Sequence, residues 1–429
     1  MSDPLPDKIV WLSNADARKS EQKKADTAQF SSTVTGHINR FHRTLPNFEP
    51  TPLAKLDKLA RHLGVASIRV KDESFRCGLN AFKILGASYA LSAHLAQKLN
   101  LPPENLSFAD FKSPELKNRL KNFTCVTATD GNHGKAVAWA AKQLGCRAMI
   151  FMPTGTTPAR LESIKSLDAD ASIIEGNYDD AVRMAAEQAG LNRWLLIQDT
   201  AWAGNEEIPM QVMQGYLTMF DEAVEQLGGS MPTHVFIQCG VGSLAGSLQG
   251  YLVEKFGDQR PQLIVVEPTK AACYYESMKA MDGRPHTVGG DLNTIMAGLA
   301  CGNPSKISWE ILRDFADVFV ACPDGVTMTG MRALGNPLAG DDRVISGESG
   351  AVTLGLLMYL LKQPELDPLK KTLNMDADAR ILLFSTEGDT DPEMYRKIVW
   401  GIDEFGIGNS FDLGFGIADL TAKRTAHRA

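Results

Sequence analysis

The sequence of 429 residues lacks several features that mark specialised classes of protein. Its seven cysteines form no C-x-x-C pair, so we expect neither a zinc site nor a disulfide. The longest apolar stretch, residues 351–361, has about half the length that a membrane-spanning helix needs. Residues 1–10 are acidic and carry no apolar run of the kind that directs export. We therefore expect a soluble, cytoplasmic protein with no metal and no membrane partner.

Positively charged residues are fewer than negatively charged ones. The chain carries 44 Lys and Arg against 51 Asp and Glu, which gives a net charge of −7. A protein that binds nucleic acid needs a basic face, so we expect no nucleic-acid partner. Hydrophobic residues make up 44% of the chain and charged residues 22%, close to the average for globular proteins. A sizeable core can therefore form, and global disorder is not expected.

Strand-like and helix-like segments alternate through the middle of the chain. The first series has helices at 135–144 and 178–189 and strands at 124–129, 147–152, 172–175 and 194–199. The second series has helices at 208–226, 243–256 and 349–361 and strands at 234–238, 262–267, 317–321 and 380–384. This alternation is typical of parallel sheets with helical crossovers.

The two series predict two domains. We expect an α/β fold of two three-layer domains with mostly parallel sheets, in which the smaller domain is inserted in the larger. The small α/β domain covers residues 95–205, and the large domain covers residues 1–94 and 206–429. In such sheets ligands bind beyond the carboxyl ends of the strands, so the residues that follow each strand are the candidates for function.

Lys83 departs from the usual charge pattern of a helix. Residues 68–73 look like a strand, and Asn80 is a good N-cap for a helix from 81 to about 95. A cation in the first turn faces the positive end of the helix dipole, which disfavours it by up to ~1 kcal/mol. This position favours the neutral amine that a Schiff-base lysine needs. The alternative is a solvated surface lysine, and the local pattern alone favours that alternative.

A glycine-rich segment follows one strand and opens a helix. Its glycines let the backbone approach a ligand, and the free N–H groups at the helix start bind phosphate. The predicted phosphate-binding residues are Gly240, Val241, Gly242, Ser243 and Leu244. A tight turn is the plain alternative. Because Glu267 ends the next strand, where a nucleotide-binding fold places its ribose acid, a nucleotide-dependent oxidoreductase also stays open.

Another strand-to-helix junction, at 127–134, combines a hydroxyl, a carboxylate and an amide. Hydroxyls and backbone donors at a helix start suit a substrate carboxylate, which makes Thr129, Asp130 and Gly131 candidates for substrate binding. Asn132 adds an uncharged donor. Asp130 is equally well explained as a helix cap. His133 alone is more typical of a packed side chain, and we assign it no role.

Two further candidates follow strands. Asp199 comes after the strand at 194–199 and faces either a cleft or a helix start. Ser385 and Thr386 follow the last strand, where a hydroxyl can meet an aromatic ring nitrogen. Helix caps are the default explanation for each of these residues.

In their order along the chain, these segments resemble the fold-type II pyridoxal-phosphate enzymes, which include threonine dehydratases and the tryptophan synthase β chain. The resemblance covers residues from about 45 to 400. Its motifs are Pro50-Thr51-Pro52-Leu53, Asn80-Ala81-Phe82-Lys83, Gly131-Asn132-His133, Gly240-Val241-Gly242-Ser243 and the serine after the last strand.

Within this group the chain is most similar to the diaminopropionate ammonia-lyases. The matching segments are residues 129–134, 199–202, 213–216, 294–302, 346–351 and 385–391. Threonine dehydratases usually carry a small residue where Asp130 stands. One departure from the pattern is Cys239, where a glycine or alanine is more usual.

The resemblance implies a cofactor and a role for several residues. Lys83 would hold pyridoxal 5′-phosphate covalently, and the segment 240–244 would bind its phosphate. Asn132 would contact the ring hydroxyl. Ser385 or Thr386 would meet the pyridine nitrogen, and the choice between these two stays open.

The resemblance also implies an activity, the elimination of ammonia from D- and L-2,3-diaminopropionate with release of pyruvate. Lys83 would take the Cα proton of the L-isomer and Asp130 that of the D-isomer, while Asp199 would bind the distal ammonium. The expected partners are a small amino acid and, as in the family, a second copy of the chain in a homodimer. A serine or threonine dehydratase of the same fold and a non-catalytic binding protein remain alternatives.

Overall fold

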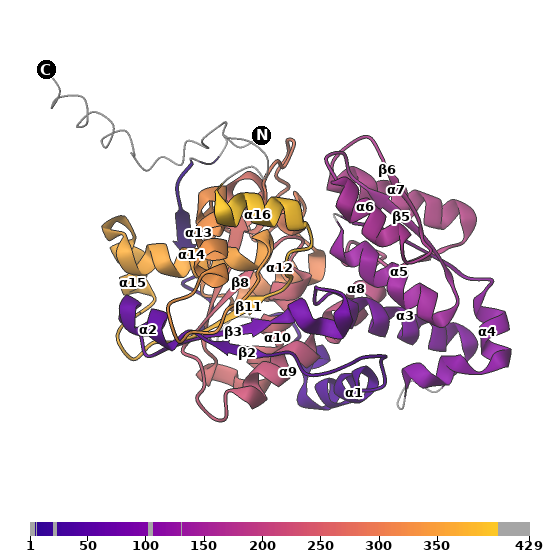
Figure 1. Cartoon of the computed structure of the whole chain (residues 1–429), viewed down its shortest axis with the longest axis horizontal. Helices are drawn as coiled ribbons and strands as arrows, with labels where there is room; N and C mark the ends of the chain where they lie inside the picture. The colour runs from indigo at the N-terminus through magenta and orange to yellow at the C-terminus, as the bar shows by residue number, and fades with distance from the viewer. Residues whose placement is uncertain (1–4, 6, 20–23, 102–105, 130, 402–429) are drawn as a thin grey trace, which may run out of the picture.

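The computed structural model describes residues 5, 7–19, 24–101, 106–129 and 131–401, and these form two sheets with helices packed on them (Figure 1). The larger sheet has the strand order β1-β10-β9-β8-β11-β3-β2. Its strands are β1 (Val10–Ser13), β2 (Leu53–Lys55), β3 (Ser67–Asp72), β8 (His234–Gln238), β9 (Gln262–Pro268), β10 (Val318–Cys322) and β11 (Arg380–Ser385). The edge strand β1 pairs antiparallel with β10, and the edge strand β2 pairs antiparallel with β3. The five strands between the two edges are parallel.

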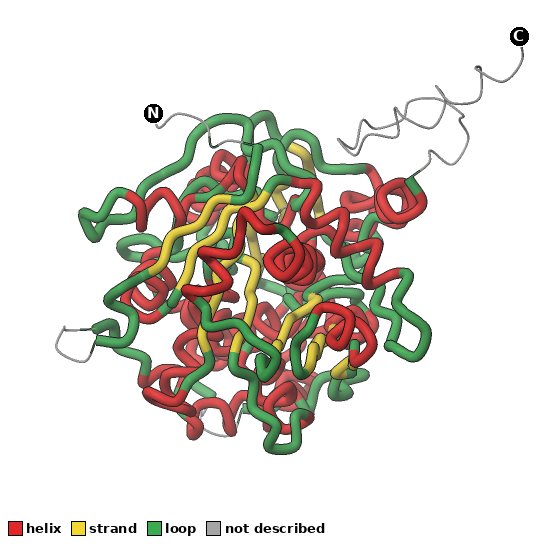
Figure 2. The backbone as a smooth tube through the Cα atoms, turned by 90° about the vertical axis from the view of Figure 1, so that its left-hand side faces the viewer, coloured by secondary structure: helices red, strands yellow, loops and turns green. Residues whose placement is uncertain are grey.

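Alternate residues of the inner strands face two separate cores. In β8, Val235 and Ile237 join one core and Phe236 joins the other. A strand that is buried on both faces needs an almost continuous apolar sequence, which explains the His234–Gln238 composition. Figure 2 shows the strands lying between helices on both sides.

The smaller sheet lies to the right in Figure 1 and has the order β6-β5-β4-β7, all parallel. Its strands are β4 (Thr124–Ala128), β5 (Arg147–Met152), β6 (Asp170–Ile173) and β7 (Leu195–Leu196), and its helices are α5 (Asn132–Leu144), α6 (Pro158–Lys165) and α7 (Tyr178–Asn192). All four strands fall inside the predicted small domain. The boundaries at 94/95 and 205/206 stay a prediction, and α3 runs through the first of them.

The remaining helices pack around the two sheets (Figure 1). They are α1 (Ser32–His42), α2 (Asp57–Leu63), α3 (Ile84–Leu99), α4 (Pro114–Leu120), α8 (Glu207–Gly215), α9 (Leu217–Gln226), α10 (Ser243–Phe256), α11 (Cys273–Lys279), α12 (Lys306–Phe315), α13 (Asp324–Gly335), α14 (Glu348–Lys362), α15 (Asp367–Thr372) and α16 (Pro392–Trp400). Within the residues that the structure describes, no helix has the length and apolarity to cross a membrane.

The mixed α/β architecture with mostly parallel sheets is confirmed, but one predicted helix is broken. The segment 208–226 forms α8 and α9, which meet at Tyr216. A Cβ at Gly215 would lie 2.5 Å from the carbonyl oxygen of Leu85, so only glycine allows α8 to pack this closely on α3. The division at Tyr216, whose φ of −72° and ψ of −14° remain helical, is a small one that the periodicity of the segment does not indicate. The strand expected at 172–175 begins two residues earlier, as β6.

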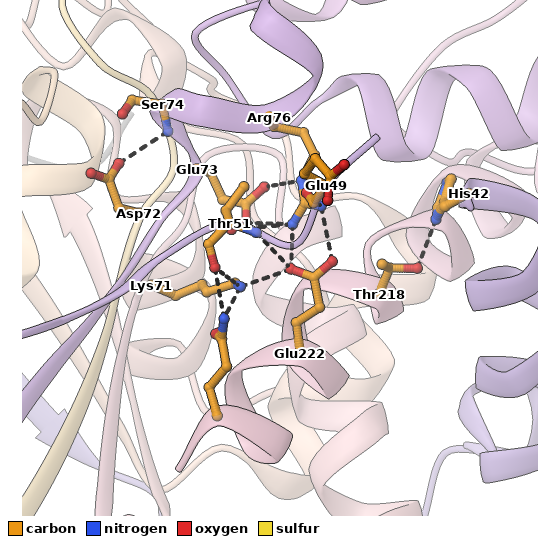
Figure 3. A network of polar contacts seen from close by, with 11 residues as sticks. His42, Glu49, Thr51, Lys71, Asp72, Glu73, Ser74, Arg76, Thr218 and Glu222 are labelled. Carbon is orange, nitrogen blue, oxygen red and sulfur yellow. Dashed lines mark hydrogen bonds and ion pairs between the residues drawn. The ribbon is translucent and has the colours of Figure 1, made fainter. Parts of the chain in front are cut away.

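A buried ionic network fixes the chain between β3 and Lys83 (Figure 3). Arg76 donates to Glu73 at 2.8 Å and to Glu222 at 2.7 Å, and Lys71 donates to the same oxygen of Glu222 at 2.7 Å. Two cations thus neutralise two carboxylates out of water, and removal of one partner would leave a buried charge unpaired. Because Thr51 also contacts Lys71 and Arg76, the network ties the Pro50–Leu53 motif to β3 and α9.

Candidate active site

A cavity that is partly open to solvent lies where the carboxyl ends of strands from both sheets meet, and its empty space, open solvent included, is about 600 Å³. Most of the predicted site residues line it: Lys83, Asn132, Asp199, Gly240, Val241, Gly242, Ser243, Leu244 and Thr386. The residues chosen by the rule that ligands bind beyond the carboxyl ends of parallel strands thus come together in one cavity.

Lys83 occupies the N-cap of α3 and not its first turn, which corrects the prediction. The reason lies before the helix: the N–H of Phe82 donates to the carbonyl of Thr386 at 3.0 Å, and Ala81 forms a bridge with Glu387. The chain is therefore held beside the end of β11 before it can turn into a helix. Asn80, the predicted cap, has a positive φ of 62° and donates to Asp389.

The amine of Lys83 lies 2.8 Å from a carboxylate oxygen of Asp199. Burial opposes the ionisation of Asp199, but Lys83, His133 and a hydrogen bond from Tyr178 outweigh it and hold the pKa of this carboxyl well below its usual range. The cavity therefore contains a fixed negative charge next to an amine. Asp199 faces the cleft, as one of the two sequence interpretations had it.

His133 lies beside this pair. Its Nε2 is 2.7 Å from the carbonyl oxygen of Ile197, which can only accept, so Nε2 carries the proton. Its Nδ1 lies 3.9 Å from Asp199, and burial lowers the pKa of the imidazole. A neutral ring therefore packs against the ion pair. No pattern in the sequence indicates this contact.

The glycine loop has a conformation that requires glycine. Gly242 has a φ of +100°, and a Cβ there would lie 1.9 Å from the hydroxyl oxygen of Tyr274. That hydroxyl donates to the carbonyl of Val241 at 2.8 Å and so fixes the loop. The loop runs into the 14-residue helix α10, whose first N–H groups have no partner within the helix. Such a helix start binds phosphate.

Glu267 does not serve a nucleotide. It is completely buried and accepts hydrogen bonds from the backbone N–H groups of Tyr274 at 2.8 Å and Tyr275 at 2.7 Å. Burial raises the pKa of this carboxyl to about 8. Glu267 thus caps the start of α11 inside the protein, where a ribose cannot reach it. The oxidoreductase alternative loses its main support.

Of the two hydroxyls after β11, that of Thr386 faces the cavity. Its Oγ1 accepts a hydrogen bond from Nε2 of Gln238 at 2.7 Å, which leaves its own proton available to a ligand. Ser385 is not part of the cavity wall, and its hydroxyl turns toward the carbonyl of Glu387 at 3.4 Å. The geometry therefore favours Thr386 as the partner of a ring nitrogen.

The candidates in the asparagine loop separate into different positions. Thr129 is buried, and its hydroxyl accepts from the N–H groups of Gly131 and Gly134 at 2.9 and 3.0 Å, so it caps α5. Gly131 lies against Arg160 and, like Thr129, is not part of the cavity wall. Asp130 lies outside the described residues. Asn132 lines the cavity, and its Nδ2 donates to Glu387.

Comparisons with known proteins identify the family. Residues 44–374 match the family described as "Pyridoxal-phosphate dependent enzyme". A diaminopropionate ammonia-lyase of Salmonella typhimurium is 49% identical over 389 residues, which cover 89% of this chain and 96% of the relative. The chain belongs to the diaminopropionate ammonia-lyases, a family of pyridoxal-phosphate enzymes. It is therefore a carbon–nitrogen lyase.

Solved structures of this family superpose closely. The Escherichia coli diaminopropionate ammonia-lyase in complex with D-serine has a TM-score of 0.82 and 44% identity, and the match covers 92% of this chain and 97% of the other. The same enzyme in complex with an "aminoacrylate-PLP azomethine reaction intermediate" has a TM-score of 0.83 and 44% identity, with coverage of 93% and 98%. These matches confirm the fold-type II architecture.

The cavity fits the cofactor of this family. Lys83 supplies an amine and the glycine loop supplies a helix start. Oη of Tyr216, Oε1 of Gln238 and Oγ of Ser349 are buried in the cavity wall and, among the described residues, have no hydrogen-bond partner. Buried polar atoms are rarely left unpaired, so these three suit a polar ligand. The enzyme thus has the donors and acceptors that pyridoxal 5′-phosphate needs.

Proposed function

We propose that this enzyme uses pyridoxal 5′-phosphate to eliminate ammonia from D- and L-2,3-diaminopropionate, with pyruvate and ammonia as products. The observation that carries the proposal is the Lys83 amine, held 2.8 Å from the buried Asp199 carboxylate in a cavity walled by the glycine loop. An amine for the cofactor and a carboxylate for a second amine are what a diamine substrate requires.

Four parts of the chain would hold the cofactor. Lys83 would bind it covalently, and the N–H groups of residues 240–244 would bind its phosphate. Asn132 would donate to the ring oxygen, and Thr386 would meet the ring nitrogen. When bound, the cofactor withdraws electrons from Cα of an attached amino acid. A neutral hydroxyl at the ring nitrogen suits elimination, because it does not hold that nitrogen protonated.

Asp199 would select the diamine. Its low pKa keeps it charged at neutral pH, and the Lys83 ammonium now beside it shows that the site accommodates a cation. A distal ammonium in this place would remain protonated, the form in which an amine leaves most readily. A substrate with a hydroxyl instead of this amine would leave the carboxylate without a cation.

Proton removal from Cα would use two bases. We assign the L-isomer to Lys83 and the D-isomer to Asp130, because the two isomers present their Cα protons on opposite faces. The homodimer of the family and a cytoplasmic location complete the proposal.

Turnover of separate isomers tests this assignment. We expect the purified enzyme to be yellow and to release pyruvate from D- and L-diaminopropionate faster than from serine or threonine. Lys83→Ala should lose the visible band and at least about a thousandfold of both activities. Asp130→Asn should lose D-isomer turnover and keep that of the L-isomer. A colourless wild-type enzyme that ignores added cofactor would refute the function, and equal losses in Asp130→Asn would refute the two-base assignment.

A further inference from the structure

One partly buried hydrogen bond at the cavity joins segments that follow strands of the two sheets and has no part in the mechanism above. Nδ2 of Asn132, at the start of α5, donates to Oε2 of Glu387, which follows β11. Glu387 is 3% exposed and lines the cavity. The hydroxyl of Thr390 donates to the same oxygen at 3.4 Å. A carboxylate in the cavity wall thus meets the amide that is proposed to contact the cofactor ring.

The direction of this bond fixes which end of the amide faces the ligand. The oxygen and nitrogen ends of an asparagine side chain are nearly equal in shape, so its surroundings decide its orientation. An ionised carboxylate only accepts, and Asn132 must therefore turn its NH₂ group toward Glu387. That group has two N–H bonds, and the second remains for an acceptor in the cavity.

We propose that Glu387 is a positioning residue: it holds Asn132 with a free N–H directed at the ring oxygen of the cofactor. The inference rests on the proposed function and adds to it a residue that acts on the cofactor through Asn132. Without Glu387, Asn132 can rotate its amide oxygen toward the ring oxygen, and two acceptors would then face each other.

The surroundings keep the side chain of Glu387 in place. A Cβ at Gly347 would lie 2.8 Å from Cγ of Glu387, so this glycine makes room for the side chain. Glu348 lies nearby, 4.0 Å from Arg160, and Asp391 adds a further negative charge. Burial and then the charge of Glu387 raise the pKa of Glu348 to about 7. Burial therefore favours the protonated form of Glu348, which reduces the negative charge beside Glu387.

Spectra of the cofactor-loaded enzyme without substrate test this role. A donor to the ring oxygen stabilises its deprotonated form, so its loss should move the pH midpoint of the visible band upward. For Glu387→Ala we expect a rise of about one pH unit and about tenfold weaker cofactor binding. Glu387→Gln keeps an acceptor and should show roughly half the shift. The exposed Glu393→Gln should leave the midpoint and the binding constant unchanged.

A double-mutant cycle separates an effect through Asn132 from a general disturbance. In an Asn132→Ala background, Glu387→Ala should cause no additional shift. An equal shift in both backgrounds, or no shift in a folded Glu387→Ala enzyme, would overturn the inference. If Glu387→Ala does not fold, as judged by circular dichroism, Glu387→Gln in both backgrounds gives the same decision. A wild-type enzyme that binds no cofactor would instead refute the proposed function.

Discussion

At the scale of single residues, the site depends on which atoms are already engaged. Lys83 is engaged by Asp199, and Asn132 by Glu387, whereas the hydroxyl proton of Thr386 is left for a ligand because Gln238 donates to its oxygen. These assignments follow from donor and acceptor rules and not from residue type alone. They favour Thr386 over Ser385 as the partner of the ring nitrogen, a choice that the sequence left open and that can now be tested.

Thr386 and Ser385 should respond differently to loss of their hydroxyls. Thr386→Ala removes the hydroxyl in the cavity wall, and we expect an altered visible band and about tenfold weaker cofactor binding. Thr386→Ser keeps the hydroxyl and should restore most of both. Ser385→Ala serves as the matched control, with binding unchanged. A larger spectral change in Ser385→Ala than in Thr386→Ala would assign the ring nitrogen to Ser385 instead.

The sequence predicted the residues that follow strands but not their partners. Lys83, Asp199 and the glycine loop were found because each stands at a strand end or helix start, where local rules apply. Glu387 was missed as the partner of Asn132 because the two residues are 255 positions apart and follow strands of different sheets. Periodicity and capping rules act over a few residues, and they contain no information on such a contact.

At the scale of elements, glycines set the close approaches. Gly215 lets α8 pack on α3, close to the point where the helix predicted over 208–226 divides into α8 and α9. Gly242 combines a positive φ with the nearby ring of Tyr274 at the start of α10. The sequence identified the second glycine through its motif. It missed the first, because the partner helix that demands a glycine is distant along the chain.

Gly242→Ala should damage the loop much more than an alanine elsewhere. The new Cβ would meet the Tyr274 hydroxyl in a backbone conformation that alanine avoids, at a cost of about 1–3 kcal/mol in unfolding free energy. Cofactor binding should weaken by about tenfold or more, since the N–H groups move. Gly190→Ala in α7, with open space around it, should stabilise by about 0.5 kcal/mol. Equal effects of both variants in urea titrations would contradict this account.

At the scale of the whole molecule, two buried carboxyl groups have pKa values that are shifted in opposite directions. Lys71 and Arg76 lie around Glu222 and, against the effect of burial, lower the pKa of its carboxyl. Glu267 has no such cation among its hydrogen-bond partners, and burial raises its pKa to about 8. The difference follows from the partners of each carboxyl: Glu222 on α9 accepts from two cations, whereas Glu267 in β9 accepts from backbone N–H groups of α11.

Glu267 should make the folded state less stable as the pH rises. Its pKa is about 4.5 in the unfolded chain and about 8 in the folded protein, so the folded state binds the proton more tightly between these values. Its contribution is complete below pH 4.5 and is lost as the pH rises through 8, by about 1.4 kcal/mol per pH unit between these values at most. Glu267→Gln cannot ionise and still offers an oxygen to the Tyr274 and Tyr275 N–H groups.

Urea titrations at pH 5, 7 and 8.5 measure this contribution, because other titrating groups are common to both proteins and cancel in the difference. The unfolding free energy of Glu267→Gln minus that of the wild type should increase from each pH to the next. For Glu393→Gln, an exposed acid on α16, the same difference should stay constant within about 0.5 kcal/mol. A difference for Glu267→Gln that does not change with pH would mean that Glu267 is already ionised in the folded protein, held by its two backbone donors.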